Sequence, residues 1–307
     1  RCSMLYSPSG SMVALVTPFT ADDKVDIPGF ETLIDRQIRY GTNSLFVLGS
    51  CGETNLLSLD ERKLIVREVV QIVNKRVPVF FNATAMKTAD AVSFAQYIEK
   101  MGGDGVIIAS PPYLLLPQTA LADYLSEIFG SISISCGIYN NPARNGVNIR
   151  PETIAALSEK HPNFVVDKEA MGNAQQILQV KRLCGDRIKT LVCDFPKYSI
   201  LLPNLGMGGD GSANVGGNII PEETALYSRP WDSMEKVYES RSLYCKYYPL
   251  LEALYWFTNP VVVKAALRIL GLPGGHLRKP HQEVVGERFE LLRKIMEDLG
   301  VIEKYGV

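Results

Sequence analysis

Residues 44–84 read SLFVLGSCGETNLLSLDERKLIVREVVQIVNKRVPVFFNAT, and this stretch decides the fold class. It begins and ends with short runs of apolar, mostly β-branched or aromatic residues, 44–50 and 77–84. Between them, residues 61–76 repeat apolar side chains near a period of 3.6, with charged residues on the other face. A strand, an amphipathic helix and a second strand in this order predict a βα unit with parallel strands.

The same unit recurs along the whole chain. Apolar runs start at residues 11, 44, 77, 105, 131, 164, 188 and 208, a spacing too wide for hairpins and typical of βα repeats. Strands that are apolar along their whole length must be covered on both faces, so eight such units predict an α/β fold, the closed (β/α)8 TIM barrel. An open doubly wound sheet is the alternative. It is disfavoured because TPFTADDKVD follows the first run, where a Gly-x-Gly-x-x-Gly turn would be expected.

The pattern divides the chain into three segments. Residues 1–10 show no periodicity and are expected to be a mobile terminus. Residues 11–230 carry the eight repeats and are assigned to the barrel. Residues 231–307 show only helical patterns, with apolar stripes that are wide for their length. We expect this C-terminal helical region to pack on the barrel or on a partner subunit.

Composition excludes several classes of function. Lys and Arg number 32 and Asp and Glu 33, so a net charge of -1 provides no basic face for nucleic acid. No apolar run approaches the roughly 18 to 20 residues that span a membrane, and we expect a cytoplasmic protein. Six cysteines without zinc-type spacing and three histidines predict reduced thiols and no metal site.

The active site of a parallel barrel forms at the carboxyl ends of its strands. Lys168 ends the sixth run, directly after Val165, Val166 and Asp167. A lysine at the mouth of a barrel loses hydration, which favours the neutral amine that can attack a ketone. The alternative is a solvated charge at the end of a strand, flanked by Asp167 and Glu169.

Two further strand ends carry groups suited to catalysis. Tyr139 ends the fifth run, and its phenol could both donate and accept a proton; the alternative is a core tyrosine with a satisfied hydroxyl. The turn GSCGET at residues 49–54 combines small residues with accessible backbone, which suits N–H groups that receive a carboxylate. Its alternative is an ordinary turn between a strand and a helix.

These features occur together in one family. The chain resembles the dihydrodipicolinate synthase and N-acetylneuraminate lyase family of class I aldolases from about residue 12 to residue 299. The motifs that carry the resemblance are LVTPF, GSCGET with LSLDER, SPPY, YNNPARNG, DKEAMGN, GGDGSANV and NPVVVKAALRILGLP.

The resemblance implies a role for each matching residue. Lys168 is implied as the lysine that forms a Schiff base with a 2-oxo acid, Tyr139 as the residue that moves protons, and Ser50 as its partner in a proton relay. The residues implied in substrate binding are Cys51, Gly52, Arg144 and Ala213. Arg144 matches an arginine that holds a second carboxylate in synthases, which favours a small acidic partner substrate over a sialic acid. No cofactor is implied, because the imine itself accepts the electrons.

Three departures from the family pattern predict altered specificity. The synthases carry two adjacent tyrosines after the fourth strand, where this chain has Tyr113 and Leu114, so the tyrosine that completes their relay through the neighbouring subunit is missing. The sequence NATA at residues 82–85 replaces a glycine-rich strand end, and Cys193 replaces a glycine.

The expected enzyme joins or cleaves pyruvate and an aldehyde, and it is expected to be a homo-oligomer, either a dimer or a tetramer. Other members of this enzyme class remain as alternatives: an aldolase for 2-keto-3-deoxy sugar acids or N-acetylneuraminate, or a dehydratase or deaminase using the same imine. A barrel enzyme for phosphorylated substrates, with residues 208–211 as its phosphate loop, is a further alternative. The non-enzyme alternative is a scaffold that binds a 2-oxo acid.

Overall fold

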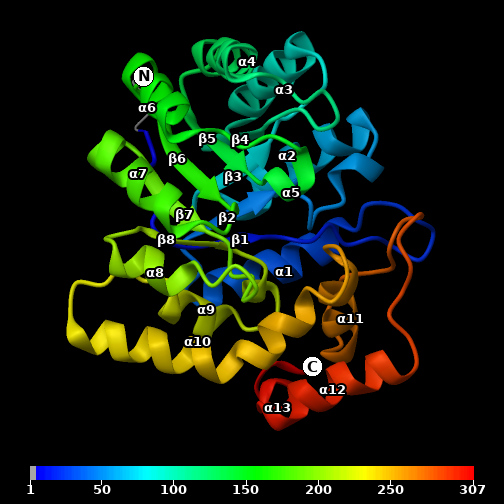
Figure 1. The fold of residues 1–307 in the computed structure, drawn as a ribbon. Helices are drawn as coiled ribbons and strands as arrows, with labels where there is room; N and C mark the ends of the chain where they lie inside the picture. Colours follow the sequence, from blue (N-terminus) through cyan, green and yellow to red (C-terminus); the bar gives the residue numbers. More distant parts are fainter. Residues whose placement is uncertain (1–4) are drawn as a thin grey trace.

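A closed barrel of eight parallel strands forms the centre of the computed structural model, which describes residues 5–307 (Figure 1). The strands are β1 (Gly10–Ala14), β2 (Ser44–Val47), β3 (Val79–Asn82), β4 (Gly105–Ala109), β5 (Ser135–Asn140), β6 (Phe164–Glu169), β7 (Lys189–Val192) and β8 (Gly211–Asn214). They follow one another in sequence order, and β1 pairs with both β2 and β8, which closes the sheet. The predicted (β/α)8 barrel is confirmed.

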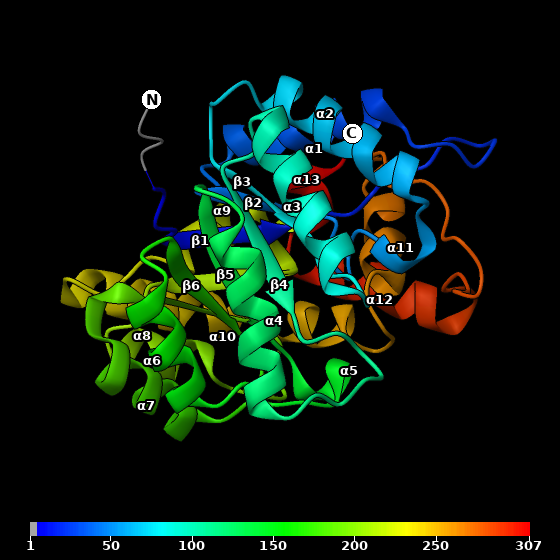
Figure 2. The same ribbon diagram turned by 90° about the horizontal axis from the view of Figure 1, so that it is seen from above.

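Helices cover the outside of the barrel, as Figure 2 shows from above. Those within the barrel repeats are α1 (Ile27–Arg39), α2 (Leu59–Val73), α3 (Thr88–Met101), α4 (Gln118–Gly130), α5 (Pro142–Asn145), α6 (Pro151–Lys160), α7 (Ala174–Cys184), α8 (Leu201–Gly206) and α9 (Pro221–Tyr227). Short 3-10 helices are η1 (Thr54–Leu56), η2 (Gly185–Arg187) and η3 (Gly216–Asn218).

Helix α2 illustrates how local sequence fixes an element. Ser58 accepts a hydrogen bond from the Glu61 N–H, and the Glu61 carboxylate accepts one from the Ser58 N–H, which makes a capping box. Asn74 ends the helix in the left-handed region, with φ of 46°. Helix α2 therefore begins two residues and ends three residues before the range 61–76 that its periodicity predicts.

The N-terminal segment is attached to the barrel. The Tyr6 N–H donates to the Ser135 hydroxyl at 2.8 Å, and that hydroxyl donates to the Tyr6 carbonyl at 2.8 Å. Strand β1 begins at Gly10. Within the expected mobile terminus of residues 1–10, Tyr6 is thus bonded to the barrel and Gly10 belongs to β1, whereas residues 1–4 lie outside the described part of the chain.

The C-terminal helical region packs on one side of the barrel. It consists of α10 (Met234–Leu254), α11 (Val261–Ile269), α12 (Glu287–Asp298) and α13 (Val301–Tyr305). Helix α10 lies along α9, and α11 contacts α10 and α12 (Figure 1). Residues 255–260, which link α10 to α11, reach the carboxyl ends of the strands. No helix in residues 5–307 combines the length and apolarity that crossing a membrane requires.

Candidate active site

A cavity of about 310 Å³ lies at the carboxyl ends of the strands, and Lys168 and Tyr139 both line it. These two residues are direct neighbours in the register of β5 and β6. The Lys168 Nζ lies 3.6 Å from the centre of the Tyr139 ring and 5.6 Å from that of Phe46. With only 6% of Lys168 exposed, its amine is enclosed by aromatic surface and still borders the cavity.

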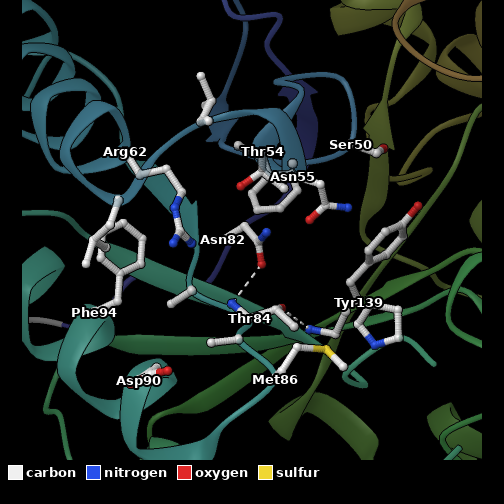
Figure 3. Close-up of a pocket in the computed structure, with 18 of the residues that line it drawn as sticks. Ser50, Thr54, Asn55, Arg62, Asn82, Thr84, Met86, Asp90, Phe94 and Tyr139 are labelled. Carbon is white, nitrogen blue, oxygen red and sulfur yellow. Dashed lines mark hydrogen bonds between the residues drawn. The ribbon is translucent and has the colours of Figure 1, made fainter. Parts of the chain in front are cut away.

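The Tyr139 hydroxyl is held at one side of this cavity. It accepts a hydrogen bond from the Asn141 amide at 2.7 Å, which leaves its own proton free to be donated. Ser50 lines the same cavity, and in Figure 3 the hydroxyl end of Tyr139 points toward the side where Ser50 lies. The predicted catalytic set of Lys168, Tyr139 and Ser50 is thus brought together around one space.

The turn after β2 contributes Ser50 and Cys51 to the cavity, but Gly52 does not line it. The Gly52 N–H donates to the Gly49 carbonyl at 3.0 Å, and its own carbonyl accepts from the Thr17 hydroxyl at 2.8 Å. A side chain on Gly52 would also press on the backbone of Leu48 at 3.2 Å. Both polar groups of Gly52 are thus used within the turn, and its direct contact with substrate stays a prediction.

Cys51 is 1% exposed, and its thiol borders the cavity. Burial raises the pKa of this thiol to about 12, so it stays protonated at neutral pH. A buried neutral thiol gives the cavity wall a small, weakly polar group. Because this thiol is only weakly polar, the backbone N–H groups around Cys51 remain the expected partner for the carboxylate of a substrate.

Arg144 and Ala213 complete the predicted binding set, and both line the cavity. Ala213 belongs to β8 and is 2% exposed. Arg144 lies on α5 and donates one hydrogen bond, at 3.3 Å, to the hydroxyl of Thr258. Within residues 5–307 no carboxylate forms an ion pair with Arg144, so its guanidinium can receive an anionic ligand.

Comparison with known proteins matches this architecture to one family. The model of the dihydrodipicolinate synthetase family matches residues 7–299. The chain belongs to this family. The 4-hydroxy-tetrahydrodipicolinate synthase of Thermodesulfovibrio yellowstonii is 35% identical over 96% of this chain and 99% of the relative, and that of Clostridium perfringens is 34% identical over equal shares.

Solved structures agree with the comparison of sequences. The dihydrodipicolinate synthase of Thermotoga maritima is 30% identical, covers 96% of this chain and all of its own, and superposes with a TM-score of 0.89. A monomeric dihydrodipicolinate synthase variant is also 30% identical, with a TM-score of 0.89 over 95% of this chain and 97% of its own. This member of the family is accordingly a lyase of the Schiff-base, pyruvate-aldolase type.

The carboxyl groups on either side of Lys168 are buried. Asp167 and Glu169 are both fully buried and Lys168 is 6% exposed, so the alternative that Lys168 is a solvated charge flanked by these two residues is wrong. Glu169 accepts hydrogen bonds from Asn140, Gln176 and the Met171 N–H. Burial, and then the nearby Glu169, raise the pKa of Asp167 well above its usual range.

One wall of the cavity consists, apart from Asn259, of residues that none of the sequence motifs above includes. Phe195 and Tyr198 follow β7, whereas Tyr255, Thr258 and Asn259 come from the link between α10 and α11. The position of Phe195 and Tyr198 after a strand could have marked them. Nothing in the local pattern of the helical region predicts that it reaches the site.

Asp194 holds this wall in place through hydrogen bonds. Its buried carboxylate accepts hydrogen bonds from the Tyr255 hydroxyl at 2.8 Å and from the N–H groups of Val215 and Gly216 at 3.0 and 2.7 Å. Burial raises the pKa of Asp194 despite these donors. One carboxyl group thereby joins the end of β7, the turn after β8 and the C-terminal region.

The glycine-rich segment before β8 lies away from the site. The Asp210 carboxylate forms ion pairs with Lys181 and Lys189 at 3.4 and 3.3 Å and accepts from the Thr190 N–H. Because β8 begins at Gly211, residues 208–210 precede the strand and lie at its amino end. The alternative of a phosphate loop at residues 208–211 of the active site is therefore wrong.

A larger groove of about 1090 Å³ extends from Ser50 and Tyr139 outward along α2 and α3 (Figure 3). The sequence NATA forms part of its floor. The Asn82 amide donates to the Leu48 carbonyl at 3.0 Å, and the Thr84 hydroxyl accepts from the Ala109 N–H at 2.8 Å. These two polar residues tie the end of β3 to its neighbours on both sides.

The loop after β4 carries the departure noted at Leu114. Neither Tyr113 nor Leu114 lines the cavity around Lys168 within one chain. Tyr113 is 91% exposed, with a positive φ of 74°, and Leu114 is 45% exposed. An effect of Leu114 on the proton relay stays a prediction.

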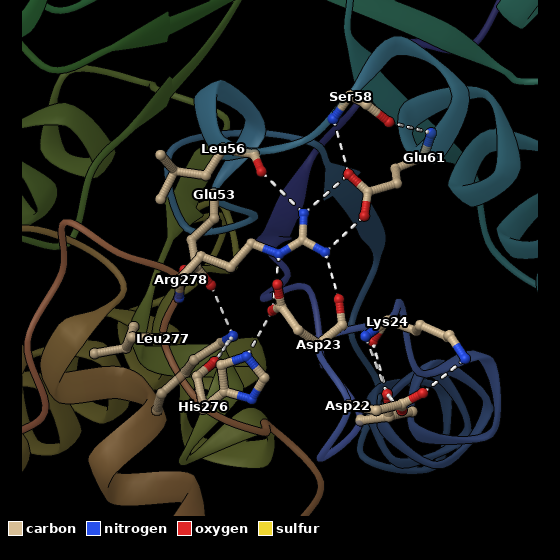
Figure 4. Close-up of polar contacts among 12 residues, drawn as sticks. Asp22, Asp23, Lys24, Glu53, Leu56, Ser58, Glu61, His276, Leu277 and Arg278 are labelled. Atoms are coloured by element: carbon tan, nitrogen blue, oxygen red, sulfur yellow. Dashed lines mark hydrogen bonds and ion pairs between the residues drawn. The ribbon is translucent and has the colours of Figure 1, made fainter.

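A cluster of charges fastens the turn after β2 to the C-terminal region (Figure 4). The Lys264 Nζ and the Glu53 carboxylate form an ion pair at 2.7 Å in which both side chains are fully buried. The backbone N–H of Arg278 donates to the same carboxylate at 3.0 Å, and the Arg278 guanidinium binds Glu61 and Asp23. Glu53 itself has a left-handed backbone, with φ of 52°, directly after Gly52.

Proposed function

We propose that the enzyme condenses pyruvate with an aldehyde through an imine on Lys168. The observation that carries this proposal is the enclosed Lys168 amine, 3.6 Å from the centre of the Tyr139 ring in a cavity that Arg144 also lines. The amine adds to the ketone carbon of pyruvate and water leaves, which forms the imine. Loss of a methyl proton gives an enamine, whose carbon attacks the aldehyde carbon.

The remaining steps balance the reaction. The aldehyde oxygen takes up a proton as the new carbon-carbon bond forms, and water then hydrolyses the imine, which releases a 4-hydroxy-2-oxo acid and restores the amine. In this proposal Tyr139 carries the protons, because its hydroxyl keeps a free proton while Asn141 donates to its oxygen. Ser50 and the backbone near Cys51 hold the carboxylate of pyruvate.

Exchange of the pyruvate methyl protons tests the proposal without any aldehyde. In deuterated water the enzyme should remove the methyl proton signal of pyruvate, because each return from enamine to imine adds a deuteron. Proton NMR follows the loss over time. Exchange no faster than in buffer alone would overturn the proposed imine and enamine.

Arg144→Ala should raise the Michaelis constant for an acidic aldehyde at least about tenfold, because a guanidinium that holds a carboxylate contributes on the order of 1.5 to 3 kcal/mol. The constant for pyruvate should change much less. Initial rates over a grid of both substrates measure the two constants, with Arg150→Ala, an exposed arginine outside the cavity, as control. An equal rise in both constants would remove Arg144 from the proposed role.

We also propose that a second copy of the chain covers the outer end of the groove, which makes the enzyme a homo-oligomer. Exposed apolar side chains gather there: Leu59 and Met86 line the groove, and Met86 and Leu114 line an adjoining hollow. Leu115, on the same loop as Leu114, is 61% exposed. Apolar surface of this kind is typical of an interface between proteins.

Replacement of Leu115 by Asp should dissociate the oligomer, because a buried interface does not accept an unpaired carboxylate. Sedimentation velocity at several protein concentrations measures the mass against the 34.0 kDa of one chain. Leu178→Asp, which alters an exposed leucine on α7, is the control and should leave the oligomer intact. A wild-type protein that sediments as a single chain contradicts the proposed oligomer.

The cysteines favour a reducing compartment such as the cytoplasm. In residues 5–307, Cys51, Cys136, Cys184 and Cys193 are buried free thiols, and Cys245 is free and exposed. Free thiols are typical of proteins in compartments that keep cysteine reduced.

A further inference from the structure

One wall of the cavity around Lys168 is aromatic. Phe195 and Tyr255 stack with ring centres 4.1 Å apart and planes inclined by 14°. Tyr198 meets Phe195 edge-on, with ring centres 5.1 Å apart. All three side chains are half-buried and line the cavity, so they present apolar surface to a bound ligand.

This wall is held in place before any ligand arrives. The Tyr255 hydroxyl is fixed by Asp194, as described above. The loop that carries the other two rings is a tight turn, in which the Tyr198 N–H donates to the Phe195 carbonyl at 3.1 Å. The Tyr198 ring also packs over Gly172, where a side chain would come within 2.8 Å of it. Rigid rings lose little conformational entropy when a planar ligand binds against them.

The charged groups that line the cavity have one sign. Lys168 and Arg144 are basic residues, of which Lys168 is bound to pyruvate when the aldehyde reacts, and no Asp or Glu of residues 5–307 lines the cavity. The carboxylate of Asp194 lies nearby but is already occupied by three donors. A carboxylate on the aldehyde therefore finds a partner in Arg144, whereas an ammonium group would find no carboxylate.

We propose that the preferred aldehyde is an anion with a planar, apolar body and without an amino group, such as a carboxylated aromatic aldehyde. The proposal rests on the imine mechanism proposed above and names the class of its second substrate. Pyruvate would occupy the end of the cavity with Ser50 and Lys168. The aldehyde would lie between that end and the aromatic wall, with its carboxylate on Arg144.

A panel of three aldehydes that each carry a carboxylate tests this class. Rates of condensation with pyruvate, followed by product mass, give kcat/KM for 4-carboxybenzaldehyde, succinic semialdehyde and aspartate semialdehyde; the product of the last is measured as the cyclic imine that it forms with loss of water. We expect the aromatic acid to exceed succinic semialdehyde several-fold, and succinic semialdehyde to exceed its amino analogue. A kcat/KM for aspartate semialdehyde above that of the aromatic acid would overturn the proposal.

Tyr198→Ala tests the wall itself. The ratio of kcat/KM for 4-carboxybenzaldehyde to that for succinic semialdehyde should fall roughly two- to twelvefold, because an aromatic contact contributes about 0.5–1.5 kcal/mol beyond its buried area. Tyr238→Ala, which removes a 61% exposed tyrosine of α10, is the matched control and should leave the ratio unchanged. An unchanged ratio in Tyr198→Ala would remove the wall from substrate selection.

Proton exchange in pyruvate separates this inference from the proposed function, because that reaction needs no aldehyde. Exchange without a preference for the aromatic acid overturns the inference and leaves the imine mechanism standing. Absence of exchange overturns both.

Discussion

We expect Lys168→Arg to lower turnover by at least about 10⁴-fold while the protein stays folded. A guanidinium remains charged and cannot form an imine with a ketone, so the change removes the covalent step and keeps the positive charge. Lys168→Ala should be equally inactive. Product formation from pyruvate and an aldehyde measures turnover, and far-ultraviolet circular dichroism reports the fold.

Lys160→Arg is the matched control, because this lysine is exposed at the end of α6 and far from the chemistry. It should retain full activity. Turnover of Lys168→Arg within tenfold of the wild type would show that another group performs the covalent step, or that no such step occurs.

Lys264→Met should lower the free energy of unfolding by about 3–5 kcal/mol. The change leaves the carboxylate of Glu53 without its cation in a fully buried position, and an unpaired buried charge is strongly destabilising. Urea titration followed by fluorescence measures the loss. The Michaelis constant for pyruvate should rise as well, because Glu53 directly follows the turn that carries Ser50 and Cys51.

The pair between Lys294 and Asp298 on α12 provides the control. Its atoms are 3.2 Å apart, but its side chains are 69% and 63% exposed. Lys294→Met should therefore cost less than about 1 kcal/mol. Adding Glu53→Gln to Lys264→Met should recover part of the loss, since it removes the stranded charge. A double variant no more stable than Lys264→Met would argue against this explanation.

The fold could be predicted because each repeat carries its own signal. Residues 61–76 show a helical period without reference to any other part of the chain, and the runs on either side are apolar throughout. Eight units are the number that closes a barrel of this kind, and in the structure the sheet closes where β1 pairs with β8, as in the pairing of Gly10 with Gly211. Boundaries were less predictable, because caps such as Ser58 and Asn74 set the ends of α2.

The candidate site could be predicted only where it is built from strand ends. Lys168 and Tyr139 end neighbouring strands, so a parallel barrel necessarily brings them close together. The motif around Gly52 does not reveal that the N–H of this glycine is used within the turn. Tyr255 reaches the cavity through contacts with Asp194, which lies far away in sequence. No local pattern encodes such a contact.

Reduction of the enzyme with borohydride in the presence of pyruvate tests the central claim most directly. Borohydride converts the imine into a stable secondary amine, so the protein should gain the mass of one reduced pyruvyl group. Peptide mapping should place this group on Lys168, and omission of pyruvate should prevent the gain. A protein without the added mass, or with the group on a lysine other than Lys168, would contradict the account.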